Sequence, residues 1–250
     1  MLPRLFCTLL LTQLRLESAR SAVLLEHERK IVVDMHNEFR DTVARGKARS
    51  WPPAADMLEM RYNTHLEELA EKHASHCIFE PGCHGCRISL DERPGQNMFA
   101  HAGPRDWSAV VRRWSHAQPQ FGTTGRSNGT IQLKPSVLSQ LLWSRSSWLG
   151  CAWKNCTSVI GTNIYVCNYF PRGNELSQHV YLAGESCSQC PKGTCCSSSS
   201  CPPARTSATN ASPAAFTGLC TCEHERLPNI FTAQCFSYKF SPQLVYAYIL

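Results

Sequence analysis

The chain has 250 residues, of which 43% are hydrophobic and 18% charged, and its formal net charge is +6. This length and hydrophobic content allow one domain of ordinary size with a packed core, plus a smaller appendage. The lysines and arginines are scattered, and no basic stripe is interleaved with aromatic residues, so the composition argues against a nucleic-acid-binding protein.

Residues 1–22 have the pattern of a secretory signal peptide. Arg4 provides a basic start, residues 5–14 an apolar run, and Ala19-Arg20-Ser21 a cleavage context of small residues. The apolar run is too short to span a bilayer, and no later run is long enough. We therefore expect a secreted, extracellular protein without a transmembrane segment, whose mature chain has a net charge of about +4.

The cysteine content favours a disulfide framework. The chain has fifteen cysteines, and loss of Cys7 with the signal peptide leaves an even number. In a secreted protein such a set forms disulfides rather than metal thiolates.

Three helices are predicted from apolar stripes at helical spacing. The first covers residues 26–46, the second begins at a capping box formed by Thr64 and Glu67, and the third is capped by Asp106. Their stripes contain, in order, Ile31, Val32, Met35, Phe39 and Val43; Leu66, Leu69, Ala70, His73, Ala74 and Cys77; and Trp107, Val110, Val111 and Trp114.

Two histidines of the second helix raise the question of a metal site. His73 and His76 are three residues apart and could share a metal ion, but only His73 lies on the apolar stripe. A zinc site needs three or four converging ligands, and the sequence places no third one. A histidine packed in the core is the favoured interpretation.

A loop with the pattern Cys83-His84-Gly85-Cys86 follows the second helix. A redox pair would need a strand before the motif and a helix after it, and this loop lies between prolines and glycines. A local structural disulfide is the favoured alternative in a secreted chain. Residues 121–134 are polar and rich in Gly, Ser and Thr, and we predict a loop there that includes the glycosylation sequon at Asn128.

The stretch from Val137 to Asn174 has the clearest signals. A short helix begins after Ser136, a plausible N-cap, and strands are predicted over residues 148–153 and 163–169. Alternation places Ile164, Val166 and Asn168 on one face of the second strand, and Tyr165, Cys167 and Tyr169 on the other.

These motifs resemble those of the CAP superfamily, which comprises cysteine-rich secretory proteins, insect antigen 5 and plant pathogenesis-related proteins of the first class. Residues 164–174, Ile-Tyr-Val-Cys-Asn-Tyr-Phe-Pro-Arg-Gly-Asn, resemble the second family signature, and residues 139–143 followed by 150–152 resemble the first. The segments His36–Arg40 and Gly95–Asn97 also resemble family motifs, with Gln96 in place of the usual Glu.

The resemblance implies an α+β fold, a three-layer α-β-α sandwich around a central antiparallel sheet. It also implies the disulfides Cys77–Cys156 and Cys151–Cys167, and leaves Cys83 and Cys86 to pair locally. A third family bridge is absent, because Pro94 and Phe170 occupy both of its positions.

Many CAP proteins hold a divalent metal with two histidines and two acidic residues. Those positions correspond here to Pro81, Gln96, Ala117 and Val137, none of which can ligate in the family manner or act as an acid or base. His84 and His116 are near in sequence and are the alternative ligands. The resemblance therefore implies a degenerate site, no cofactor and no catalysis.

The resemblance divides the chain. Residues 23–176 are expected to form the CAP domain, 177–201 a cysteine-rich hinge-like segment, and 202–219 a flexible linker that carries a second sequon at Asn210. Residues 220–250, with Cys220, Cys222 and Cys235, form a tail that we do not assign. The hinge-like segment contains Cys187, Cys190, Cys195, Cys196 and Cys201, whose pairing the sequence leaves open.

Two functions from different classes remain. The first is a secreted, venom-allergen-like binding module without catalytic activity, whose partner is an extracellular protein or a small lipid. The alternative is a metal-dependent peptidase or a peptidase inhibitor of the CAP type. Loss of the four metal-site residues favours the first.

Overall fold

The structure is a computed structural model that describes residues 24–49, 51–80, 93–118, 121–127 (backbone only), 129–196 and 216–222. Its centre is a four-stranded sheet in the order β1-β5-β6-β2. Strands β5, β6 and β2 pair antiparallel, and the two-residue β1 is parallel to β5. The bounds are β1 Arg61–Tyr62, β2 Gly95–His101, β5 Trp148–Cys156 and β6 Thr162–Phe170.

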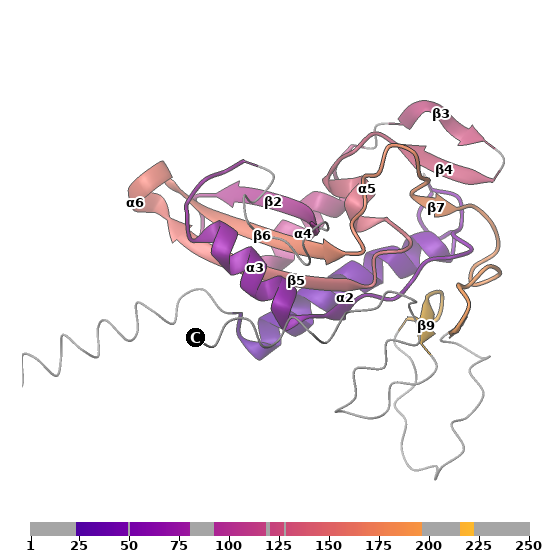
Figure 1. Cartoon of the computed structure of the whole chain (residues 1–250), viewed down its shortest axis with the longest axis horizontal. Coiled ribbons are helices and arrows are strands. Elements are labelled where there is room, and N and C mark those ends of the chain that lie inside the picture. The colour runs from indigo at the N-terminus through magenta and orange to yellow at the C-terminus, as the bar shows by residue number, and fades with distance from the viewer. Residues whose placement is uncertain are drawn as a thin grey trace, which may run out of the picture.

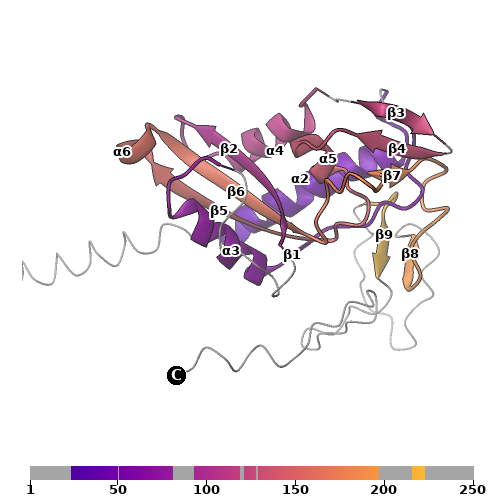
Figure 2. The same ribbon diagram turned by 45° about the horizontal axis from the view of Figure 1, so that its top comes forward.

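Helices cover both faces of this sheet, which makes the three layers (Figure 1). Helix α3 packs on one face, against β5 and β6, whereas α2, α4 and α5 lie on the other (Figure 2). The fold implied by the family resemblance is therefore confirmed. The helices are α2 Glu26–Ala44, α3 Thr64–Ala74, α4 Trp107–Ser115 and α5 Val137–Leu141, with a short α6 Thr157–Ile160 beyond β5.

The alternation predicted for β6 separates the two core clusters. Tyr165, Cys167 and Tyr169 are buried in the larger cluster, under α2 and α4. Ile164 and Val166 are buried in the smaller one, under α3. A period of two in the sequence thus correctly predicts which side chains face which layer.

Two of the predicted helix caps are confirmed and one is wrong. Asp106 Oδ1 accepts a hydrogen bond from the Ala109 amide at 2.9 Å, and Ser136 Oγ accepts one from Ser139 at 3.1 Å. Helix α3 is capped by Asn63 and not by Thr64. The predicted box fails because Glu67 binds Arg29 of α2, at 2.8 Å, instead of its own helix start.

The loop predicted over residues 121–134 is a hairpin. Strands β3 (Phe121–Ser127) and β4 (Thr130–Leu133) pair antiparallel, and β4 also pairs with β7 (Tyr181–Leu182). The prediction is wrong because β4 gains its second partner from residues 50 positions later and buries Ile131 beneath them. The sequon residue Asn128 lies outside the described residues.

The structure contains both disulfides that the resemblance implies. Cys77 at the end of α3 is bonded to Cys156 at the end of β5, and Cys151 is bonded to Cys167 across β5 and β6. Cys83 and Cys86 lie outside the described residues. None of the described helices has the length and apolar character needed to cross a bilayer.

The predicted linker is too long at its C-terminal end. Residues 216–219 pack on the domain, and Leu219 is completely buried in the larger core cluster. The next residue, Cys220, exchanges backbone hydrogen bonds with Met57 and Glu59 at 2.8 and 2.9 Å. The composition of this stretch suggested a linker because the burial of a single apolar residue, such as Leu219, depends on contacts with the folded core and cannot be read from the neighbouring residues. The strands here are β8 Thr194–Cys196 and β9 Cys220–Cys222.

Candidate functional site

Gln96 is the one polar residue among the described positions of the family metal site. Its side-chain nitrogen lies 3.1 Å from His73 Nδ1 and 3.0 Å from Asn168 Oδ1. Asn168 in turn donates to the carbonyl of Leu66 at 3.2 Å. Since one amide nitrogen has two protons, it donates to both neighbours, and His73 Nδ1 is then an acceptor. We refer to His73, Gln96 and Asn168 as the amide cluster.

The amide cluster is electrically neutral near pH 7. Burial lowers the pKa of His73, against a backbone hydrogen bond at Ile78 that favours the charged ring, and nearby His76 lowers the pKa further. Asn168 is fully buried and His73 nearly so. The Nδ1 atom of this ring is occupied by the Gln96 amide, and the cluster has no charged group that could hold a metal ion.

The His73–His76 metal pair considered from the sequence is not assembled. His76 is exposed, and its Nδ1 lies 2.7 Å from the carbonyl of Lys72 on its own helix. His73 instead faces the sheet, as its place on the apolar stripe predicts, and bonds Gln96. His73 is therefore a buried core histidine, as the favoured interpretation of the sequence predicted.

Val137 is joined to the strand that carries Gln96, but it packs on the opposite face of the sheet from the amide cluster. Asn97, the neighbour of Gln96 on β2, donates to the carbonyl of Val137 at 2.9 Å and so joins the start of α5 to this strand. Val137 and Ala117 are both half-buried and pack against the larger core cluster. Their alkyl side chains offer no ligand atom, and Pro81 lies outside the described residues.

The alternative ligands do not complete a site among the described residues. His116 is exposed at the C-terminal end of α4, and its Nδ1 lies 2.8 Å from the carbonyl of Arg112. His84 lies outside the described residues. Within the described part of the chain, the only group of potential metal ligands that converges consists of cysteines.

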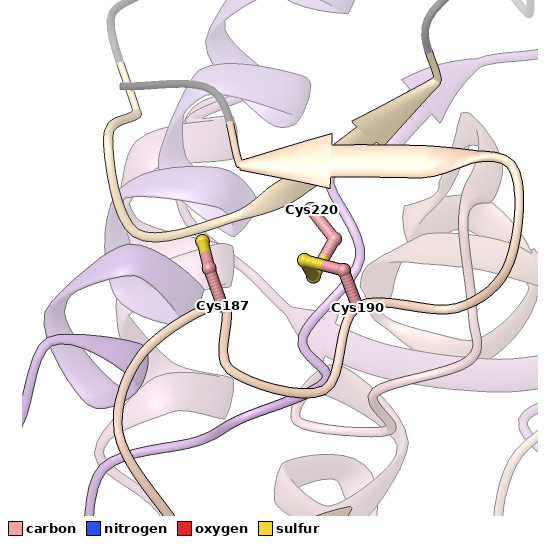
Figure 3. A group of neighbouring side chains, drawn as sticks. All are labelled: Cys187, Cys190 and Cys220. Atoms are coloured by element: carbon pink, nitrogen blue, oxygen red, sulfur yellow. A yellow bond between two sulfur atoms is a disulfide. The ribbon is translucent and has the colours of Figure 1, made fainter. Parts of the chain in front are cut away.

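Those cysteines are Cys187, Cys190 and Cys220, whose sulfur atoms all lie within 4.8 Å of one another (Figure 3). Each is oxidised: Cys187 is bonded to Cys196, and Cys190 to Cys220. A disulfide sulfur is not a thiolate, so this group cannot bind a metal in its present state. Cys195 is also disulfide-bonded, and Cys201 lies outside the described residues.

A second polar network, on the opposite face of the sheet, was not assigned a role from the sequence. His36 Nδ1 donates to the Val32 carbonyl at 2.7 Å, and its Nε2 accepts from the Tyr169 hydroxyl at 2.9 Å. Asn97 donates to the same hydroxyl at 3.2 Å. Burial lowers the pKa of His36 to about 4 and raises that of Tyr169, so both are uncharged near neutral pH.

Arg40, one helical turn after His36, is completely buried and has a structural role. Burial lowers its pKa to about 9, against the favourable field of Asp56, and the side chain remains charged at pH 7. It donates hydrogen bonds of 2.6–3.2 Å to five backbone carbonyls, those of Leu58, Leu141, Trp143, Ser144 and Ser146. An arginine on the buried side of an amphipathic helix is the signal that could have revealed this role.

The comparison with protein families identifies the family of this fold. The family model described as "CAP: Cysteine-rich secretory protein family" matches residues 33–169, more than half of the chain. The chain belongs to this family. In this chain Arg40, at the end of the segment His36–Arg40, joins the first helix to the backbone around it.

This CAP protein is similar to several curated relatives. It is 30% identical over 185 residues to venom allergen 5 of Tityus serrulatus, covering 69% of this chain and 44% of the relative. It is 32% identical over 191 residues to peptidase inhibitor 16 of Bos taurus, covering 74% of this chain and 38% of the relative. The chain therefore spans less than half of the length of these relatives.

Solved structures agree on the fold. The crystal structure of Na-ASP-1 superposes with a TM-score of 0.55 at 25% identity, covering 81% of this chain and 49% of the other. The family predicted from the sequence motifs is therefore confirmed, and the protein is venom-allergen-like in its fold and its relatives.

Proposed function

We propose that this CAP protein is a secreted binding module without catalytic activity, and that its partner is an extracellular protein or a small lipid. The observation that carries the proposal is the state of Gln96. Where the family pattern has a carboxylate, this chain has a neutral amide whose nitrogen is engaged by His73 and Asn168. A residue held in this way supports the local structure and has no charge with which to hold a cation.

The chemistry of the remaining positions supports the same conclusion. A catalytic zinc ion needs three nitrogen, thiolate or carboxylate ligands and one open position. Acid–base catalysis needs a side chain that titrates within reach of the substrate. Val137 and Ala117 provide alkyl groups only, and the Nδ1 atom of His73 is occupied by the Gln96 amide.

Secretion is supported by the cysteine chemistry. Four disulfides join pairs of described residues. Such bonds persist in oxidising compartments. The signal-peptide pattern of residues 1–22 and the sequons at Asn128 and Asn210 are consistent with export and glycosylation.

Titration of the secreted protein with Zn²⁺, followed by calorimetry, tests the proposal. We expect no stoichiometric binding at micromolar concentrations. A variant that restores the family residues is the positive control: Pro81→His, Gln96→Glu, Ala117→Glu and Val137→His together should bind zinc if it folds. Stoichiometric binding by the unmodified protein, lost on His84→Ala or His116→Ala, would show a relocated site and revive the metal-dependent peptidase.

Peptidase inhibition is the alternative that the name of the bovine relative suggests. Assays of representative serine, cysteine and metallopeptidases with the secreted protein would separate it from other kinds of binding. Mass spectrometry of molecules that co-purify with the protein would separate the two partner classes. A lipid present in stoichiometric amounts favours the lipid branch, and its absence together with captured protein favours the protein branch.

A further inference from the structure

Two disulfides of the C-terminal extension lie against each other. Cys187 and Cys190 belong to the loop before β8, Cys196 ends β8, and Cys220 begins β9. Figure 3 shows Cys187 beside the Cys190–Cys220 bond, and its sulfur lies within 4.8 Å of both sulfurs of that bond. Cys187 is itself bonded to Cys196. Four sulfur atoms of two different bonds are therefore neighbours.

The same four residues have the geometry for a second pairing. Cys196 and Cys220 are direct partners in the antiparallel β8–β9 register. The Cα atoms of such partners are about 4.5–5.5 Å apart, within the range that a disulfide spans. Cys187 and Cys190 have the spacing of a Cys-x-x-Cys motif, and their sulfurs are already close. The second pairing joins two residues that are already cross-strand partners and two whose sulfurs are already neighbours, so it is compatible with the pairing of β8 and β9.

We propose that these four cysteines form a thiol-exchange site, at which an external thiol converts the pairs Cys187–Cys196 and Cys190–Cys220 into Cys187–Cys190 and Cys196–Cys220. The external thiolate attacks the Cys196 sulfur, forms a mixed disulfide and releases the Cys187 thiolate. That thiolate attacks Cys190, forms the first new bond and releases the Cys220 thiolate. Cys220 then attacks the mixed disulfide at Cys196, forms the second new bond and returns the thiol, so no net oxidation or reduction occurs.

Burial limits where an external thiol can attack. Cys187, Cys190 and Cys196 are half-buried, whereas Cys220 is almost completely buried. The Cys187–Cys196 bond therefore has two sulfurs open to attack, whereas the Cys190–Cys220 bond has one. Attack by Cys187 on the second bond is intramolecular, which gives it the advantage of a reacting group already held close to its target.

The exchange changes how the extension is attached to the CAP domain. In the present pairing the Cys190–Cys220 bond ties the loop to β9, which is hydrogen-bonded to Met57 and Glu59 of the domain. In the second pairing β9 keeps these hydrogen bonds, but the loop loses its covalent link to it. The thiol would thus move the covalent link to β9 from Cys190 in the loop to Cys196 at the end of β8, while the hydrogen bond from the Gln189 amide to the Ala55 carbonyl still joins the loop to the domain.

Tryptic mapping under non-reducing conditions tests the proposal on the full secreted chain. Cleavage after Arg172, Lys192, Arg205 and Arg226 yields fragment 173–192 with Cys187 and Cys190, fragment 193–205 with Cys196, and fragment 206–226 with Cys220. Before treatment, fragment 173–192 should be linked to both others. After incubation with a small amount of reduced glutathione and an acid quench, it should be recovered unlinked, with an internal disulfide.

The double variant Cys187→Ser with Cys196→Ser is the matched control, because it lacks the internal nucleophile. Its fragment 173–192 should stay linked to fragment 206–226 under the same treatment. The proposal is overturned if treated wild-type protein keeps both original links, or accumulates only a glutathione adduct at Cys196. It is also overturned if the control releases fragment 173–192 as fast as the wild type does.

Discussion

The two faces of the central sheet use similar residues for different purposes. Gln96 and Asn97 are neighbours on β2, yet Gln96 bonds His73 on the α3 face and Asn97 bonds the hydroxyl of Tyr169 on the α2 face. On the α3 face the amide bonds a helix histidine directly, whereas on the α2 face the Tyr169 hydroxyl stands between Asn97 and His36. The two amides differ in burial: Asn97 is almost completely buried, whereas Gln96 is half-buried.

On the α2 face the polar residues hold the fold together. His36 and Arg40 are completely buried, and their partners are mostly backbone carbonyls. On the α3 face Gln96 is half-buried and its partners are side chains. A substitution there can change charge without disturbing the backbone, which explains how this chain can lack the family carboxylate and keep the fold.

Replacing Arg40 should have the largest effect. Arg40→Met would remove the hydrogen bonds of Arg40 to five backbone carbonyls, and we expect a loss of about 3–5 kcal/mol in the free energy of unfolding. Arg113→Met on the exposed side of α4 is the matched control and should change it by less than about 0.5 kcal/mol. Denaturant unfolding measures both. Equal effects of the two substitutions would contradict the structural role of Arg40.

Lowering the pH should destabilise the protein through His36. Its pKa is about 4 in the folded state and 6.5 when unperturbed, so between these values the unfolded chain binds a proton that the folded chain does not. Stability therefore falls as the pH drops from about 6.5 to 4, by about 3 kcal/mol from this residue.

The two faces can be compared by removing each histidine in turn. His36→Gln should flatten the dependence of unfolding free energy on pH more than His73→Gln does, because His73 is less deeply buried and its pKa is lowered less strongly. Measurements at several pH values between 4 and 7 decide this. If His73→Gln reduced the pH dependence of the unfolding free energy more than His36→Gln did, our conclusion that His36 is the more strongly perturbed histidine would be wrong.

The smallest effects are expected from the neighbouring amides. Asn97→Ala removes a donor to the Val137 carbonyl and the Tyr169 hydroxyl inside the core, and should cost about 2 kcal/mol. Gln96→Ala removes bonds nearer the surface and should cost about 1 kcal/mol or less. Thermal or denaturant unfolding of the pair measures the difference. A costlier Gln96→Ala would mean that the amide cluster is a main support of the fold.

The sequence alone determined the features that depend on neighbouring residues. The alternation of Tyr165, Val166 and Cys167 assigns the two faces of β6, because successive side chains of a strand point in opposite directions. The caps at Asp106 and Ser136 are confirmed, since each side chain bonds an amide three residues away. The family motifs and the neutral side chains at the metal positions are likewise properties of the sequence.

Only the tertiary structure decided the features that depend on distant partners. Glu67 does not cap its own helix because its carboxylate binds Arg29 of another helix. Residues 130–133 form a strand because β7 pairs with them. Arg40 donates hydrogen bonds to carbonyls about a hundred residues away in the chain, such as that of Leu141. Leu219 is buried, in a stretch whose composition suggests a linker, because the assembled core has a place for it. Local patterns record one residue's preferences, whereas these contacts exist only after folding brings their partners together.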